Sequence, residues 1–121
     1  MTSNASAAAV DALLPLPPVT FHLLLSLLDG ERHGYAIIQD VETRTRGELR
    51  LSAGTLYRSI ARMVEQELIA EVAKRAPGDD ERRRYYRITA FGIAVARAEM
   101  RRLSDLVRLA RLSGLAPTSA G

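Results

Sequence analysis

Just after Leu68 the spacing of apolar residues changes, and this change limits the fold more than any other feature of the chain. Before it, apolar side chains recur at a helical spacing, at Leu56, Ile60, Met63, Val64 and Leu68. From Ile69 the period becomes that of a strand, and it resumes over Arg83 to Ile88 after the turn residues Ala76 to Asp80. A helix that leads directly into a two-stranded hairpin is therefore predicted.

Two shorter helices are predicted before this one, the first strongly apolar and the second amphipathic. Val19 to Leu28 ends at Asp29-Gly30, a typical helix stop signal. Gly34 to Thr45 places its apolar residues on one face, which carries Tyr35, Ile38 and Val41. Residues 1–18 are rich in Ala, Ser and Pro and show no sustained period, so they predict a flexible N-terminal arm.

The last long segment predicts a helix that pairs with a second copy of the chain. Thr89 is placed to cap a helix that runs to about Leu112. Its apolar residues follow the spacings of a coiled coil and cover more surface than one small domain can bury. The predicted dimerisation residues are Ala96, Met100, Leu103, Leu106, Val107 and Ala110.

Together these segments predict a mainly α fold with a small β-hairpin. A length of 121 residues fits one compact domain. We expect a winged helix-turn-helix domain over residues 19–88, a long C-terminal dimerisation helix over residues 89–112 and a tail over residues 113–121.

The polar face of the helix that Ser52 begins favours DNA binding. Side chains three and four residues apart share the face opposite the apolar stripe, and Gly54 leaves room for a phosphate near the helix start. The predicted DNA-contacting residues are Ser52, Gly54, Thr55, Tyr57, Arg58, Ser59 and Arg62. Two alternatives remain: the arginines are ordinary solvated charges, and Tyr57 packs against the second helix.

The arms of the hairpin are basic, which is typical of a wing that holds the DNA backbone. Sixteen of the 17 basic residues in the chain are arginines, and the net charge is +3. The tip is acidic at Asp79, Asp80 and Glu81, so phosphate contacts are predicted for the arms, unless the arginines pair with these acids instead. The predicted wing contacts are Lys74, Arg75, Arg82, Arg83 and Arg84.

Several classes of function are disfavoured. The chain has no cysteine, no phosphate-binding glycine loop and only two histidines, His22 and His33, whose separation does not suit a metal site. We therefore expect no enzyme, no cofactor and no metal. The longest apolar run, Leu23 to Leu28, is too short to cross a membrane and no signal peptide is evident, so a cytoplasmic protein is predicted.

In the order of its motifs the chain resembles the PadR-like transcriptional regulators from about Phe21 to Arg111. The segments that carry the resemblance are Leu24 to Gly30, His33-Gly34-Tyr35, Leu51 to Arg58, Glu67-Leu68-Ile69, Arg84-Tyr85-Tyr86 and Ile88 to Gly92. The resemblance implies a homodimer, joined mainly through its C-terminal helix, that binds double-stranded DNA with residues 52–68 and usually represses transcription.

Some relatives of that kind bind aromatic or drug-like ligands near the dimer interface, and one subgroup uses tryptophan there. This chain has no tryptophan, so the resemblance does not extend to a tryptophan stacking pocket. A small-molecule effector at the dimer interface is thus left unidentified. The alternative function is a protein-interaction module with a winged-helix fold and no specific DNA site.

Overall fold

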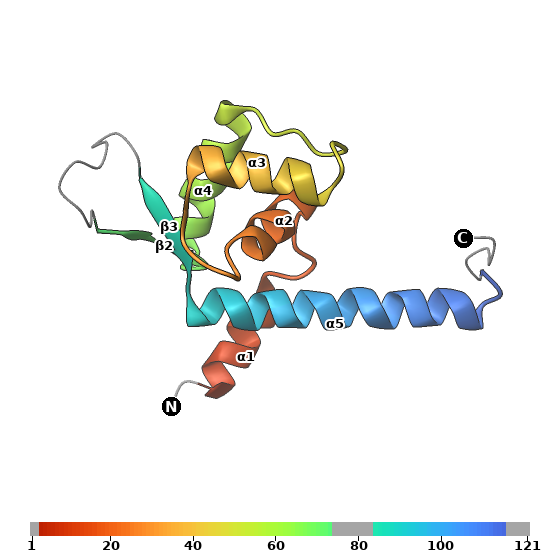
Figure 1. Ribbon diagram of the computed structural model, residues 1–121. Coiled ribbons are helices and arrows are strands. Elements are labelled where there is room, and N and C mark those ends of the chain that lie inside the picture. The colour runs from red at the N-terminus through yellow and green to blue at the C-terminus, as the bar shows by residue number, and fades with distance from the viewer. Residues whose placement is uncertain (1–2, 74–83, 116–121) are drawn as a thin grey trace.

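The computed structural model describes residues 3–73 and 84–115, in which helices surround a small sheet and one long helix extends away from it (Figure 1). The elements are α1 (Ser3–Ala12), α2 (Pro18–Ser26), β1 (Arg32–His33), α3 (Gly34–Arg44), α4 (Ala53–Glu65), β2 (Ile69–Val72), β3 (Tyr85–Ile88) and α5 (Ala90–Leu112). We call α2, α3, α4 and the sheet the head. This is the winged-helix arrangement with a long C-terminal helix that the sequence predicts.

The sheet is antiparallel, with strand order β1-β3-β2. Strands β2 and β3 form the predicted hairpin, in which Ile69 pairs with Ile88 and Val72 with Tyr85. Strand β1 adds to the other edge of β3 and was not predicted, because two residues are too few to show a period. The predicted turn at Ala76 to Asp80 lies outside the described residues.

Helix α4 begins as predicted and ends earlier. The Ser52 side chain accepts a hydrogen bond from the Thr55 backbone N–H, so Ser52 is the N-cap, and Leu56, Ile60 and Met63 are buried in the core. The helix stops at Glu65 and not at Leu68, because Glu67 adopts a positive φ of 63° that turns the chain toward β2.

The buried face of α3 differs from the predicted one. Ile37 and Val41 are buried, whereas Tyr35 is 64% exposed. Gly34, Ile37 and Val41 are spaced by three and four residues, and the predicted set by three and three. Both spacings are helical, so periodicity alone could not separate the two faces. Packing decides: Gly34 lies directly against the side chain of Tyr57 in α4.

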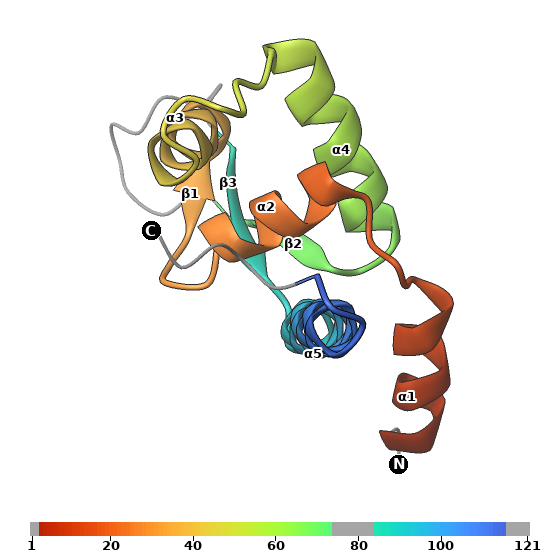
Figure 2. The same cartoon turned by 90° about the vertical axis from the view of Figure 1, so that its right-hand side faces the viewer.

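The prediction of a loose arm over residues 1–18 is wrong for much of this segment. Ser3–Ala12 is a helix, and Val10 and Leu16 are buried with the core. Helix α1 packs against α5, as the two views of the ribbon show (Figures 1 and 2). An alanine-rich segment has high helix propensity, and a partner some 90 residues along the chain supplies the packing that a local reading does not reveal.

A buried carboxylate holds the segment after α1 on α5. Glu99 is only 3% exposed. It accepts two hydrogen bonds of 2.8 Å from the Arg102 guanidinium and a backbone hydrogen bond from Leu16. The Arg102 hydrogen bonds outweigh burial and hold the pKa of Glu99 below its usual value.

We expect Glu99→Gln to weaken the fold at neutral pH by about 1–2 kcal/mol, because it removes a charge-assisted bidentate pair. A carboxylate whose pKa is lowered by folding stabilises the fold at pH values above its ordinary pKa of 4.5. This contribution is lost as the pH falls through the lower pKa of the folded state. The difference from the wild type should therefore shrink on acidification. Urea unfolding from about pH 7 to about pH 3 measures it.

The exposed Glu48 supplies the control for this experiment, since Glu48→Gln removes the same charge. It should differ little from the wild type at every pH. A gap between wild type and Glu99→Gln that stays constant down to the lowest pH would contradict the assigned role of Glu99.

Candidate nucleic-acid interface

Helix α4 is positioned so that its first turn is the part of the head farthest from α5. In both ribbon views α4 starts at the top of the head and descends to the sheet beside the start of α5 (Figures 1 and 2). Its apolar side is fixed in the core by Leu56, Ile60 and Met63. The opposite side is therefore turned outward.

The residues selected from the sequence do gather on this outward side. Ser52, Gly54, Tyr57, Arg58 and Arg62 are exposed, while Thr55 and Ser59 are half-buried at its margin. The connection from α3 adds two further exposed arginines, Arg46 and Arg50, which the sequence analysis did not select. Their only sequence signal was a positive charge in the turn that precedes the helix.

A short hydrogen-bonded chain lies over the amino-terminal end of α4. The Thr55 backbone N–H donates to Ser52 Oγ at 3.1 Å, and Ser52 Oγ donates to Thr55 Oγ1, also at 3.1 Å. The Arg58 Nη2 donates to the same Thr55 Oγ1 at 3.4 Å. The guanidinium of Arg58 is thereby folded back toward the start of its own helix.

Gly54 lies beneath that guanidinium. A Cβ at Gly54 would lie 3.6 Å from Arg58 Nη1, an ordinary contact distance. Without one, the backbone of the first turn stays open, and unpaired N–H groups and the positive end of the helix dipole favour an anion there.

Tyr57 has two environments, which correspond to the two roles considered for it. Its hydroxyl packs against Gly34 at the start of α3, where any Cβ would overlap it. The side chain is nevertheless 49% exposed. The predicted packing of Tyr57 against the second expected helix, which is α3, is thus present. A phosphate contact of Tyr57 stays a prediction.

Of the predicted wing residues only Arg84 lies within the described chain. Lys74, Arg75, Arg82 and Arg83 lie outside the described residues. Arg84 Nε is 3.8 Å from Glu71 Oε2 across the hairpin, and both side chains are exposed, so the pair contributes little to stability. The base of the hairpin is firmer, because Tyr86 is buried in the core and the ring of Tyr85 meets that of His33 edge-on at 5.4 Å.

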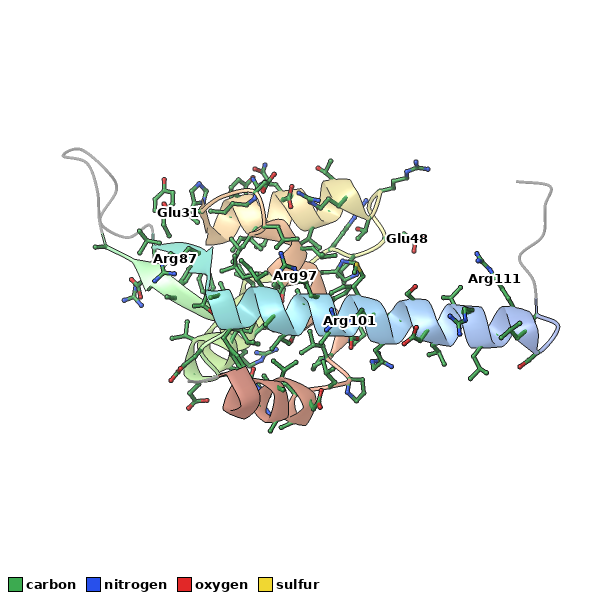
Figure 3. All side chains as sticks on the ribbon, turned by 90° about the horizontal axis from the view of Figure 1, so that it is seen from below. Glu31, Glu48, Arg87, Arg97, Arg101 and Arg111 are labelled. Atoms are coloured by element: carbon green, nitrogen blue, oxygen red, sulfur yellow. The ribbon has the colours of Figure 1, made fainter. Side chains whose placement is uncertain are left out.

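Helix α5 continues its buried face past the end of the head. Gly92, Val95 and Glu99 are buried against the head, and the same face carries on through Leu103, Leu106 and Ala110. Seen from below, the last turns of α5, where Arg111 lies, project beyond the other described elements (Figure 3).

The six predicted dimerisation residues therefore differ in how far they are exposed. Ala96 is 6% exposed and already packed inside the chain, so it offers little surface of its own to an interface. Met100, Leu106 and Val107 are more than half exposed, and Leu103 and Ala110 are half-buried. Leu109 and Leu112 add exposed apolar surface to the projecting turns.

A shallow apolar groove of about 250 Å³ runs between α2 and the first half of α5. Met100 and Leu28 stand exposed at its rim. The lining residues are Phe21, Leu25, Leu28, Ile93, Ala96, Arg97 and Met100.

Two further features are absent from the part of the chain that the structure describes. Over residues 3–73 and 84–115, no three His, Asp or Glu side chains gather as a metal ion would require. Within the same ranges, no helix is both long enough and apolar enough to span a membrane.

Comparison with known proteins gives a consistent result. Residues 23–98 match the transcriptional regulator PadR-like family. A curated protein of Lysinibacillus sphaericus, uncharacterised protein X, is 34% identical over 86 residues, which cover 71% of this chain and 72% of that protein.

Solved structures agree. A transcriptional regulator from Clostridium thermocellum superposes with a TM-score of 0.67 at 25% identity, over 77% of this chain and 89% of that one. Bacillus subtilis PadR, solved in complex with operator DNA, superposes with a TM-score of 0.62 at 16% identity, over 71% of this chain and 48% of that one. At that identity the second likeness concerns the fold alone.

Proposed function

Because the chain belongs to the PadR-like family, whose members are transcriptional regulators and not enzymes, we propose that it represses transcription as a homodimer bound to a two-fold symmetric operator. The observation that carries the proposal is the outward face of α4, with the Arg58 guanidinium held at its amino-terminal end. In a helix-turn-helix protein the amino-terminal residues of the recognition helix contact base edges in the major groove. The superposition with the operator-bound Bacillus subtilis PadR supports this use of the fold.

In the proposed complex each subunit places one α4 in the major groove, and the two half-sites lie about 34 Å apart, one turn of the duplex. Arg58 reads a guanine, while Arg84 and the basic residues near it hold the backbone. The projecting half of α5 joins the two subunits, and the groove between α2 and α5 is the apolar surface that receives the second copy. Such a protein acts in the cytoplasm, the location that the sequence predicts.

An effector at the dimer interface would act by favouring one relative orientation of the two heads. Since α5 is continuous from the head to its projecting turns, a small change in how the two α5 helices cross would alter the distance between the two α4 helices. Repression and effector response are both tested by transcription in vitro from a promoter that contains an operator selected from a genomic DNA pool.

We expect selection from a genomic DNA pool to enrich a palindrome, and Arg58→Ala to weaken binding to it by about 1–3 kcal/mol while relaxing the base preference at one position of each half-site. The control Arg101→Ala removes the same charge from the exposed side of α5 and should leave that preference intact. Fluorescence anisotropy on matched duplexes measures both variants. If Arg58→Ala weakens all duplexes equally, Arg58 contacts phosphate instead; if no sequence is enriched, the protein-interaction alternative is favoured.

A further inference from the structure

Resting on the proposed function, we propose that Thr55 is a positioning residue: its hydroxyl holds the Arg58 guanidinium at the first turn of α4, so that base preference at the Arg58 position depends on Thr55. The supporting geometry is the contact of 3.4 Å from Arg58 Nη2 to Thr55 Oγ1. The same oxygen accepts a hydrogen bond of 3.1 Å from Ser52 Oγ.

Thr55 itself is well fixed. Its backbone N–H is bound by the N-cap Ser52, and its side chain is half-buried at the margin of the outward face. A β-branched side chain in a helix has few rotamers, so the hydroxyl is a firm point of attachment. Arg58 is exposed and its long side chain has many rotamers, so this contact gives its guanidinium a defined place.

That place is unusual for a cation. The amino-terminal end of a helix carries a partial positive charge, so a guanidinium is disfavoured there unless an anion or an acceptor group joins it. The Arg58 guanidinium lies over Gly54, where the backbone is bare. The hydrogen bond that Thr55 accepts from Arg58 therefore keeps a cation at a place that an electronegative ligand, such as the acceptor edge of guanine or a phosphate, would complement.

The consequence concerns specificity more than affinity. Ordering a free arginine on binding costs about 0.5–1.5 kcal/mol, which corresponds to about twofold to tenfold in affinity. If Thr55 supplies that order in advance, its loss should reduce discrimination at the single base pair that Arg58 reads. Binding to duplexes that already lack this base pair should change little.

The test uses the full chain and the operator obtained by selection, with a second duplex that differs only at the Arg58-dependent base pair. Thr55→Val removes the hydroxyl and keeps the shape, so we expect the affinity ratio of the two duplexes to fall about twofold to tenfold. Thr55→Ser keeps the hydroxyl and should restore most of the ratio. In an Arg58→Ala background, Thr55→Val should have no further effect on the ratio.

Three results would overturn the inference. The first is an unchanged affinity ratio in Thr55→Val. The second is an equal loss of affinity for both duplexes, which makes Thr55 a direct contact to the DNA backbone. The third is a loss of the ratio in the double variant that is the sum of the two single losses. All three leave sequence-specific binding by the wild type in place, so they are distinct from failure of the proposed function, in which the wild type itself selects no operator and both proposals fall together.

Discussion

Replacing Gly92 with alanine is expected to lower the free energy of unfolding by about 2–3 kcal/mol, as overpacking of a rigid site typically does. A Cβ at Gly92 would overlap the backbone carbonyl oxygen of Leu68 and lie 2.9 Å from Ile88 Cγ1. Neither neighbour can withdraw easily. Leu68 is fully buried, and its carbonyl accepts a hydrogen bond of 3.0 Å from the Thr89 N–H.

Thr89 fixes the contact between Gly92 and Leu68, because its side chain is hydrogen-bonded to both of the segments that meet there. Its Oγ1 donates to the Glu67 carbonyl at 2.6 Å and accepts from the Gly92 N–H at 2.9 Å, so it caps α5 while holding the chain that leaves α4. Gly92 is thus the point at which α5 crosses the link between α4 and β2. An added methyl group must push these two elements apart.

Urea unfolding at one protein concentration measures the effect, because the stability of a self-associating protein depends on concentration. The matched control is Gly54→Ala, also in the first turn of a helix, where the nearest atom to the new Cβ is 3.6 Å away. Its unfolding midpoint should stay close to that of the wild type. Equal midpoints for Gly92→Ala and Gly54→Ala would show that the contact with Leu68 is not tight in solution.

The features that the sequence predicts well are those with local causes. Ser52 and Thr89 cap α4 and α5 as expected, since an N-cap needs only its own side chain and the helix that follows. The β2–β3 hairpin likewise follows from alternation and turn residues. These signals lie within a few residues of the structure that they specify.

The features that the sequence does not reveal depend on contacts between distant segments. The segment after α1 is held by Glu99, which accepts a hydrogen bond from the Leu16 backbone more than eighty residues earlier, and no local pattern links the two. The α5 stripe shows the same limit, because Ala96 and Val107 belong to one apolar period although the first is buried in its own chain and the second is exposed. A period shows which side chains share a face and does not show what covers it.

The same division applies to the outward face of α4, which we propose contacts DNA. Spacing alone placed Arg58 and Arg62 on the polar side of α4, and both are exposed there. Spacing could not show that the Arg58 guanidinium bends back to Thr55, because the rotamer of a long side chain depends on the atoms around it. The exposure of Arg58 was predictable from the sequence, and the orientation of its guanidinium was not.

The largest effect on DNA binding should come from a residue far from α4. Leu106 is 52% exposed on the face of α5 that continues beyond the head. A charge at this position would have to be buried without a partner in the proposed dimer, which is strongly unfavourable. We therefore expect Leu106→Glu to yield a folded monomer at concentrations where the wild type is a dimer.

Loss of the dimer removes the linkage between the two half-site contacts. Once one subunit is bound, the second binds as if at a high local concentration, and this typically raises affinity by about 100-fold or more. Leu106→Glu should forfeit that gain on the palindrome while binding an isolated half-site as the wild-type subunit does. Sedimentation velocity and fluorescence anisotropy on full and half operators measure the two effects together.

Arg101→Glu provides the control, because it places the same glutamate on α5 away from the predicted dimerisation residues. Arg101 is exposed and lies five residues before Leu106, which places it about 140° around a helix of 3.6 residues per turn. This variant should remain dimeric and bind the palindrome normally. If Leu106→Glu also stays dimeric, the face through Leu103, Leu106 and Ala110 is not the dimer interface; if it is monomeric but binds the palindrome as tightly as the wild type, paired reading of two half-sites is wrong.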